Sequence, residues 1–122
     1  MEAVMVDNDA HADAVVLHVK GDVDSGTFGE LVSHLNTALA QAATHPIHLL
    51  IVDLRGVTYF GSAGLNAVLD CHHKARAAAT TLRVVADNLE VLRPIEVTNL
   101  DQVLEVYRAF DEAVQHRDGK LS

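Results

Sequence analysis

The chain has 122 residues, 49% of them hydrophobic and 21% charged, which is the composition of a single globular domain with its own core. Seventeen acidic against nine basic residues give a formal net charge of −8, which argues against nucleic acid and anionic lipid as partners. No apolar run reaches the roughly 20 residues of a membrane helix, and the acidic N-terminus lacks the basic region of a signal peptide. We therefore expect a cytoplasmic protein without direct membrane insertion.

The first part of the chain predicts two strands with no helix between them. Residues 4–6 are a short apolar run, and residues 8–13 are an acidic loop rich in turn-forming residues. The segment 14–20 is rich in β-branched residues and ends at Gly21, which predicts a second strand. Because a parallel pair needs a long crossover connection, these two strands indicate a mixed sheet.

An acidic loop over residues 21–26 follows the second strand. Its carboxylates, on Asp22 and Asp24, suggest a calcium-binding loop. Such a loop beginning at Asp22 needs a glycine and a glutamate where this chain has Thr27 and Ser33. The spacing therefore argues against a metal site.

The first predicted helix begins after this loop. Thr27 and Glu30 have the spacing of a capping box, in which the two side chains satisfy free backbone N–H groups at the start of a helix. Apolar residues then recur at helical spacing for about four turns. Pro46 ends this helix, because the residue before a proline is disfavoured in helical conformation.

The centre of the chain predicts a buried strand followed by a second helix. Residues 49–52 are a continuous apolar run, closed by Asp53 and Leu54, which is typical of a central strand covered on both faces. A break at residues 55–56 separates it from a short apolar segment over 57–60. Helical spacing then continues to about Ala79. Cys71, the single cysteine, lies in this helix and cannot form an internal disulfide, which fits a reducing compartment and a packing role.

The remaining residues predict two more strands and two more helices. A strand over residues 80–86 is followed by a short helix, for which Asp87 and Asn88 supply a cap. A last strand spans 103–107, and a closing helix has its apolar side within 109–114. Residues 115–122 are polar and expected to be flexible.

The order of these elements predicts an α/β fold. Strands that alternate with helices form a mainly parallel sheet with crossover helices. We expect one domain over residues 1–122, with a mixed, mainly parallel sheet of about four to five strands and about four helices.

Ser62 is the candidate functional residue, because it lies where the strand pattern ends and the helical pattern begins. One interpretation is structural, since a serine at a helix N-cap contributes about 1 kcal/mol relative to alanine. A second is a hydrolytic nucleophile on a strand–turn–helix elbow. A third is a phosphate acceptor, since the hydroxyl is flanked by Gly61 and Gly64 and is therefore accessible.

The nucleophile interpretation fails on the motif. The elbow has glycine two residues before the serine, and this chain has Phe60 there. His116 lies in the expected flexible end, and His72 and His73 lie on the helix that Ser62 itself begins. The eight histidines also lack the spacing of a metal site, so we expect no catalytic residue, no metal and no cofactor.

The phosphate-acceptor interpretation has a physical consequence. A phosphate adds about −1.5 to −2 charges, which the free N–H groups at the start of the helix tolerate. At a contact surface beside Asp22 and Asp24, the same charge would repel an acidic or apolar partner. Ser62 could therefore act as a binding switch.

The segment from Val52 to Leu65, VDLRGVTYFGSAGL, resembles the signature of the STAS domain, in particular of the stand-alone anti-sigma factor antagonists of bacteria. The upstream sequence from Gly21 to Asp24, GDVD, followed by Thr27, is similar to that family's loop and helix start. The resemblance covers nearly the whole chain.

The resemblance implies that Ser62 is phosphorylated by an anti-sigma factor with serine kinase activity. The unphosphorylated chain would bind this factor and so free a sigma factor, and a PP2C-type phosphatase would restore that form. The implied partner-binding surface consists of Asp22, Asp24, Thr27, Gly61, Ser62, Ala63, Gly64, Leu65 and Asn66.

Two positions depart from the family pattern. The family often has aspartate before the acceptor serine and a second hydroxyl after it, whereas this chain has Gly61 and Ala63. No neighbouring hydroxyl then competes with Ser62. Related single-domain proteins with an S-A-G-L turn also resemble subunits of ABC-type lipid transport complexes, which is the alternative function.

Overall fold

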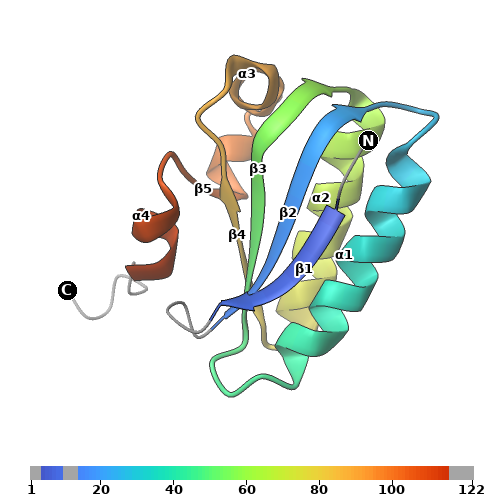
Figure 1. Ribbon diagram of the computed structural model, residues 1–122. Coiled ribbons are helices and arrows are strands. Elements are labelled where there is room, and N and C mark those ends of the chain that lie inside the picture. Colours follow the sequence, from blue (N-terminus) through green and yellow to red (C-terminus); the bar gives the residue numbers. More distant parts are fainter. Residues whose placement is uncertain (1–3, 10–13, 116–122) are drawn as a thin grey trace.

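The computed structural model describes residues 4–9 and 14–115, and the order of its elements is the predicted one (Figure 1). Most of the predicted loop over 8–13 and of the predicted flexible end over 115–122 lies outside the described residues. The elements are β1 Val4–Asp9, β2 Ala14–Val23, α1 Phe28–Ala43, β3 Leu49–Phe60, α2 Ser62–Ala77, β4 Thr81–Val85, α3 Leu89–Val97, a 3-10 helix Leu100–Gln102, β5 Glu105–Tyr107 and α4 Phe110–Gln115.

The five strands form one sheet, in which each strand lies beside the strand that precedes it in the chain. β1 pairs antiparallel with β2, and the other three pairs are parallel. The prediction of a mixed, mainly parallel sheet with about four helices is therefore confirmed over the residues that the structure describes.

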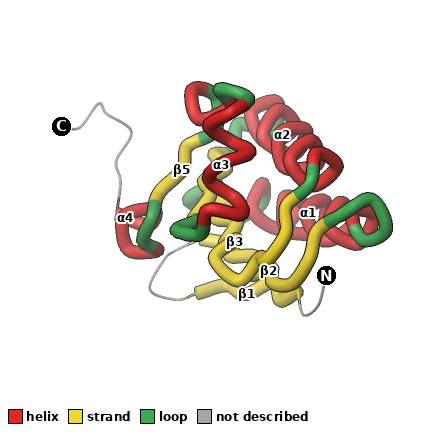
Figure 2. Tube along the Cα trace, turned by 90° about the horizontal axis from the view of Figure 1, so that it is seen from above, coloured by secondary structure: helices red, strands yellow, loops and turns green. Residues whose placement is uncertain are grey.

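Helices cover the two faces of the sheet unequally. α1, α2 and α3 pack on one face, as Figure 2 shows from above, and α4 packs on the other. Successive side chains of β3 point to opposite faces of the sheet, so β3 contributes residues to the hydrophobic core on each face. Leu50 and Val52 belong to the larger core under α1, α2 and α3, whereas Leu49 and Ile51 face Ala113 of α4.

Three strands are longer than the sequence predicts. β1 continues to Asp9, although residues 8–9 belong to the predicted loop. β2 does not end at Gly21 but continues to Val23, and β3 runs from Leu49 to Phe60 without the expected break. β2 and β3 stay paired past these glycines, and the register of the pairing shifts beside them. Gly56 lies so close to β2 that a Cβ atom there would be 2.6 Å from the Lys20 Cβ. Glycine at 56 thus keeps the two strands paired, where the sequence suggested that it ended a strand.

The ends of the helices also differ in detail from the prediction. Thr27 is the N-cap of α1, as expected, but its side chain makes no capping bond, and exposed Glu30 makes no reciprocal one. Pro94 lies inside α3, which is only nine residues long. The last strand is shorter than predicted because the chain forms the 3-10 helix before it.

Candidate functional site

The candidate site lies at the end of the sheet where β2 and β3 terminate and α1 and α2 begin (Figure 1). Val23 pairs with Phe60, the last residue of β3, and its carbonyl accepts a hydrogen bond of 3.0 Å from the Gly61 N–H. The loop that carries Asp22 and Asp24 is therefore bonded directly to the turn before Ser62. The structure brings together the two segments that the sequence singled out.

The sequence predicts Ser62 as the N-cap of α2, but in the structure Ser62 is the first residue of the helix. The N-cap is Gly61, whose backbone is extended (φ −84°, ψ 178°) and whose carbonyl accepts the first helical hydrogen bond, from the Leu65 N–H. The Ser62 side chain is exposed, and no described residue forms a hydrogen bond with its hydroxyl. Ser62 is therefore not engaged in capping, and its hydroxyl faces solvent.

The residues after Ser62 divide into an exposed set and a buried set. Asn66 is exposed one helical turn after Ser62, so the two side chains lie on the same side of α2. Ala63 is half-buried, whereas Gly64 and Leu65 are buried. Of the predicted partner-binding residues in α2, Ser62 and Asn66 are thus exposed, whereas Gly64 and Leu65 are buried beneath them.

The loop before α1 is held by its own side chains. The Asp22 carboxylate accepts a hydrogen bond of 2.6 Å from the Thr58 hydroxyl of β3. The Asp24 carboxylate accepts bonds from the N–H groups of Gly26 (2.9 Å) and Thr27 (3.1 Å). The Thr27 hydroxyl accepts a bond of 3.0 Å from the Asp24 N–H. Thr27 therefore closes this turn instead of capping the helix, and the exposed Asp22 is fixed beside β3.

Tyr59 is a site residue that the sequence analysis did not single out. Its side chain is exposed near the end of β3 and lies against Gly61. A Cβ atom at position 61 would be 3.1 Å from its Cε2 and 3.2 Å from its hydroxyl. The aromatic ring thus covers the backbone immediately before Ser62. An aromatic residue two positions before a glycine is the only signal of this contact in the sequence.

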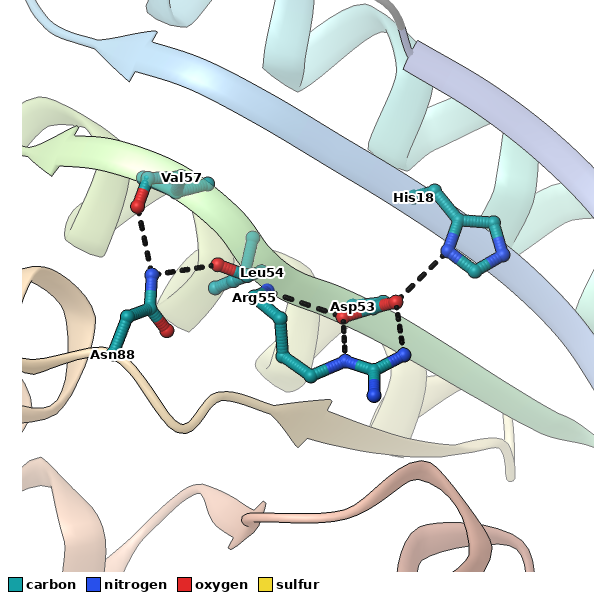
Figure 3. Close-up of polar contacts among 6 residues, drawn as sticks. All are labelled: His18, Asp53, Leu54, Arg55, Val57 and Asn88. Carbon is teal, nitrogen blue, oxygen red and sulfur yellow. Dashed lines mark hydrogen bonds and ion pairs between the residues drawn. The ribbon is translucent and has the colours of Figure 1, made fainter.

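A second polar cluster joins β2 and β3 on the sheet face that carries α4 (Figure 3). The buried Asp53 carboxylate accepts hydrogen bonds from the Arg55 Nε and Nη2, both 2.9 Å, and lies 2.9 Å from the His18 Nδ1. Burial alone would raise the pKa of Asp53, but the hydrogen bonds and charge of Arg55 and the hydrogen bond of His18 together hold it below its ordinary value. The cluster therefore keeps a buried charge paired.

Asn88 ties the start of α3 to the middle of β3 (Figure 3). The sequence predicts it as a helix cap, and it is the N-cap of α3, but its side chain does not cap the helix. Its Nδ2 donates hydrogen bonds to the Leu54 and Val57 carbonyls, at 3.1 and 2.7 Å. These carbonyls flank the irregular part of β3, so Asn88 satisfies backbone groups that a regular sheet would have paired.

The described residues offer little for catalysis at Ser62. None of their side chains forms a hydrogen bond with the Ser62 hydroxyl, so no general base is positioned to activate it. Over residues 14–115, the His, Cys, Asp and Glu side chains do not gather into a group of three that could hold a metal ion. No helix in the described part of the chain is long and apolar enough to span a membrane.

Comparison with known proteins identifies the family of this chain and several relatives of similar sequence. The family model of the STAS domain matches residues 5–113. A Mycobacterium tuberculosis protein, named as a candidate anti-anti-sigma factor, is 31% identical over 106 residues, which cover 87% of this chain and 70% of that protein. The anti-sigma-F factor antagonist RsfA of the same species is 26% identical over 107 residues, covering 85% of this chain and 80% of RsfA.

Solved structures agree with the sequence relatives. The crystal structure of an anti-sigma factor antagonist from Mycobacterium paratuberculosis superposes with a TM-score of 0.81 and 27% identity, covering 93% of this chain and 94% of that one. The anti-sigma factor antagonist SpoIIAA in its unphosphorylated form superposes with a TM-score of 0.70, covering 92% and 93% of the two chains. At 17% identity, SpoIIAA supports the fold alone.

Proposed function

Since the chain belongs to the STAS domain family, we propose that it is an anti-sigma factor antagonist whose binding to an anti-sigma factor is switched off by phosphorylation of Ser62. The names of its mycobacterial relatives support the antagonist role. They favour it over the alternative, a subunit of an ABC-type lipid transport complex. In this proposal the chain regulates sigma-factor-dependent transcription by binding and carries no catalytic activity of its own.

The observation that carries the proposal is the exposed Ser62 hydroxyl, which no described residue engages, on a surface shared by two fixed loops. A kinase can reach this hydroxyl without unfolding any element. The phosphate would stand at the first turn of α2, where backbone N–H groups lack helical partners and tolerate negative charge. Modification would therefore change the contact surface and leave the fold in place.

The proposed partners follow from the same surface. An anti-sigma factor with serine kinase activity would bind the unmodified chain and later phosphorylate Ser62, and a PP2C-type phosphatase would remove the phosphate. The added charge of about −1.5 to −2 would weaken the complex, since it must be desolvated or meet the partner beside Asp22 and Asp24. Because a sigma factor is a subunit of RNA polymerase, the proposal places the chain in the cytoplasm.

Intact-mass spectrometry tests the phosphorylation. The purified chain is incubated with the anti-sigma kinase of the same organism and Mg-ATP, and we expect a mass increase of one phosphate. Ser62→Ala should remain unmodified. Ser25→Ala is the matched control, because Ser25 is an exposed serine in the adjoining loop, and it should be modified like the wild type. Unmodified wild type, or a phosphate that persists in Ser62→Ala, contradicts the proposal.

Calorimetry tests the switch. Ser62→Asp places a negative charge in the first turn of α2, which stabilises a helix by about 0.3–1 kcal/mol, so the fold should be retained. We expect this variant to bind the anti-sigma factor at least about tenfold more weakly than the wild type, the cost of desolvating one added charge at a contact. Equal affinities of the two proteins would rule out a charge-controlled switch at this position.

A further inference from the structure

Tyr59 is the most exposed aromatic side chain on the surface that carries Ser62. It is the residue before the last one of β3, opposite Asp22 in the pairing with β2, and 54% of its surface is accessible. Its hydroxyl has no hydrogen-bond partner among the described residues. The fold therefore leaves both its ring and its hydroxyl available at the candidate site.

The position of the ring depends on glycine at residue 61. Three atoms of the Tyr59 side chain lie 3.1–3.4 Å from the place where a Cβ atom of residue 61 would stand. These distances are tighter than most Cβ contacts, so alanine at 61 would require the ring to shift by a few tenths of an ångström.

The backbone angles at this position do not require glycine. Gly61 has φ −84° and ψ 178°, an extended conformation that any residue adopts. It is the N-cap of α2, where glycine is only a few tenths of a kcal/mol less favourable than serine, aspartate or asparagine. The space it leaves is filled by the Tyr59 ring.

From this contact we propose that Tyr59 is an aromatic anchor for the anti-sigma factor, held in its binding position by Gly61. The proposal rests on the proposed function and specifies the chemistry of the partner, which presents an apolar pocket to the ring. Exposed tyrosines are enriched among the residues that dominate protein interfaces, because they bury a large rigid surface at low entropic cost. A phosphate on nearby Ser62 would disfavour the same apolar contact, because the charge would have to lose its water.

Two other exposed apolar residues lie at helix starts. Phe28 and Leu89 are the first residues of α1 and α3, and both are exposed. They follow β2 and β4, the two strands beside β3, so the starts of α1 and α3 lie at the same end of the sheet as the end of β3 (Figure 1). An apolar partner surface therefore fits this end better than a highly charged one.

Calorimetric titration with the purified anti-sigma factor tests the anchor. Tyr59→Ala should weaken binding by about tenfold to a hundredfold, the range of an interface hot spot. Tyr59→Phe, which keeps the ring, should bind within about threefold of the wild type. Ile47→Ala is the matched control, because Ile47 is 52% exposed but lies just before β3 at the opposite end of the sheet, and its affinity should not change.

A double-mutant cycle tests the dependence on Gly61. Gly61→Ala should weaken binding when Tyr59 is present and have little effect in the Tyr59→Ala background, because the ring it displaces is already gone. If the two substitutions weaken binding independently, Gly61 does not position the ring and the proposal is wrong. Thermal unfolding of each variant verifies that the affinities are those of folded protein.

The chain also permits a test without the partner. It has two tyrosines and no tryptophan, so Tyr107→Phe leaves Tyr59 as the only source of aromatic fluorescence above that of phenylalanine. Gly61→Ala in this background should increase quenching of Tyr59 by acrylamide, and unchanged quenching would overturn the proposed contact.

The outcomes separate this inference from the proposed function. A wild-type chain that binds no anti-sigma factor overturns the proposed function and the anchor with it. Normal wild-type binding with unchanged affinity of Tyr59→Ala overturns the anchor alone.

Discussion

Asp53 is a buried residue whose ionisation is coupled to folding. Its carboxylate is buried, and the hydrogen bonds of Arg55 and His18 outweigh the cost of burial. The pKa of Asp53 therefore lies below its ordinary value of 3.8. Because the folded state holds the ionised form more tightly, this stabilisation is fully present above the ordinary pKa and is lost as the pH falls through the folded-state pKa.

Asp53→Asn should lower the free energy of unfolding at pH 7 by about 1–3 kcal/mol, because the amide cannot accept the same charged hydrogen bonds. The difference from the wild type should shrink as the pH is lowered below 4, since the wild type then loses the same interaction. Urea unfolding at several pH values measures both effects. Asp101→Asn, a change at an exposed carboxylate without a described hydrogen bond, should follow the wild type throughout. A pH-independent difference for Asp53→Asn would contradict this account.

Single residues show where prediction from the sequence stops. Asp22, Asp24 and Ser62 could be selected from their types and spacing, and the structure places them at one end of the sheet. The bonds of His18 to Asp53 and of Asn88 to β3 join residues 31 to 35 positions apart. Such contacts depend on strand register, which no local pattern contains. The assignment of Ser62 as N-cap was wrong by one residue, because glycine can occupy the cap without a side chain.

At the scale of elements, α2 is held close to the sheet by a missing side chain. A Cβ atom at Gly64 would lie 2.6 Å from the Val23 Cγ1 and 3.0 Å from the Phe60 Cε1. Both of these residues are buried at the ends of their strands. The first turn of α2, which carries Ser62, can therefore approach β2 and β3 only with glycine at position 64.

Gly64→Ala should destabilise the chain by about 1–3 kcal/mol, because overpacking outweighs the higher helix propensity of alanine. Gly29 is the matched control, since it also lies in the first turn of a helix but has no atom within 4 Å of its Cβ position. Gly29→Ala should stabilise the chain by up to about 1 kcal/mol. Urea midpoints of both variants measure these changes. Shifts of the same sign would show that helix propensity alone determines the two stability changes.

The elements themselves were largely predictable. Periods of two and of 3.6 residues identify the strands and helices, and their alternation gives the parallel sheet, because both signals are local. The ends of β2 and β3 were not predictable. Gly21 and Gly56 have the composition of strand breaks, but in the structure they lie inside a continuous pairing with shifted register. Only the neighbouring strand determines which of the two roles a glycine has.

For the molecule as a whole, Cys71 can report when the core opens. It lies on α2 within the larger core, and burial raises the pKa of its thiol to about 11, although the charge of Lys74 opposes this slightly. The thiolate is the reactive form, so both access and ionisation protect the folded chain from alkylation.

At pH 8 we expect iodoacetamide to modify Cys71 in the native chain at least about a hundredfold more slowly than in the urea-unfolded chain, from the pKa difference alone. Mass spectrometry of timed samples gives both rates. Gly64→Ala should react faster than the wild type if labelling proceeds through unfolding, whereas Gly29→Ala should not. Rapid modification of the native wild type would contradict the burial of this residue.

The order of the strands has a consequence for synthesis on the ribosome. Each strand joins the edge formed by the strand before it, so the sheet can grow as the chain emerges without inserting a strand between two others. The surface around Ser62 is built from β2, β3 and the first turns of α1 and α2, all within residues 14–77. The parts of this surface are therefore all synthesised before β4 and β5, which complete the sheet at its other edge.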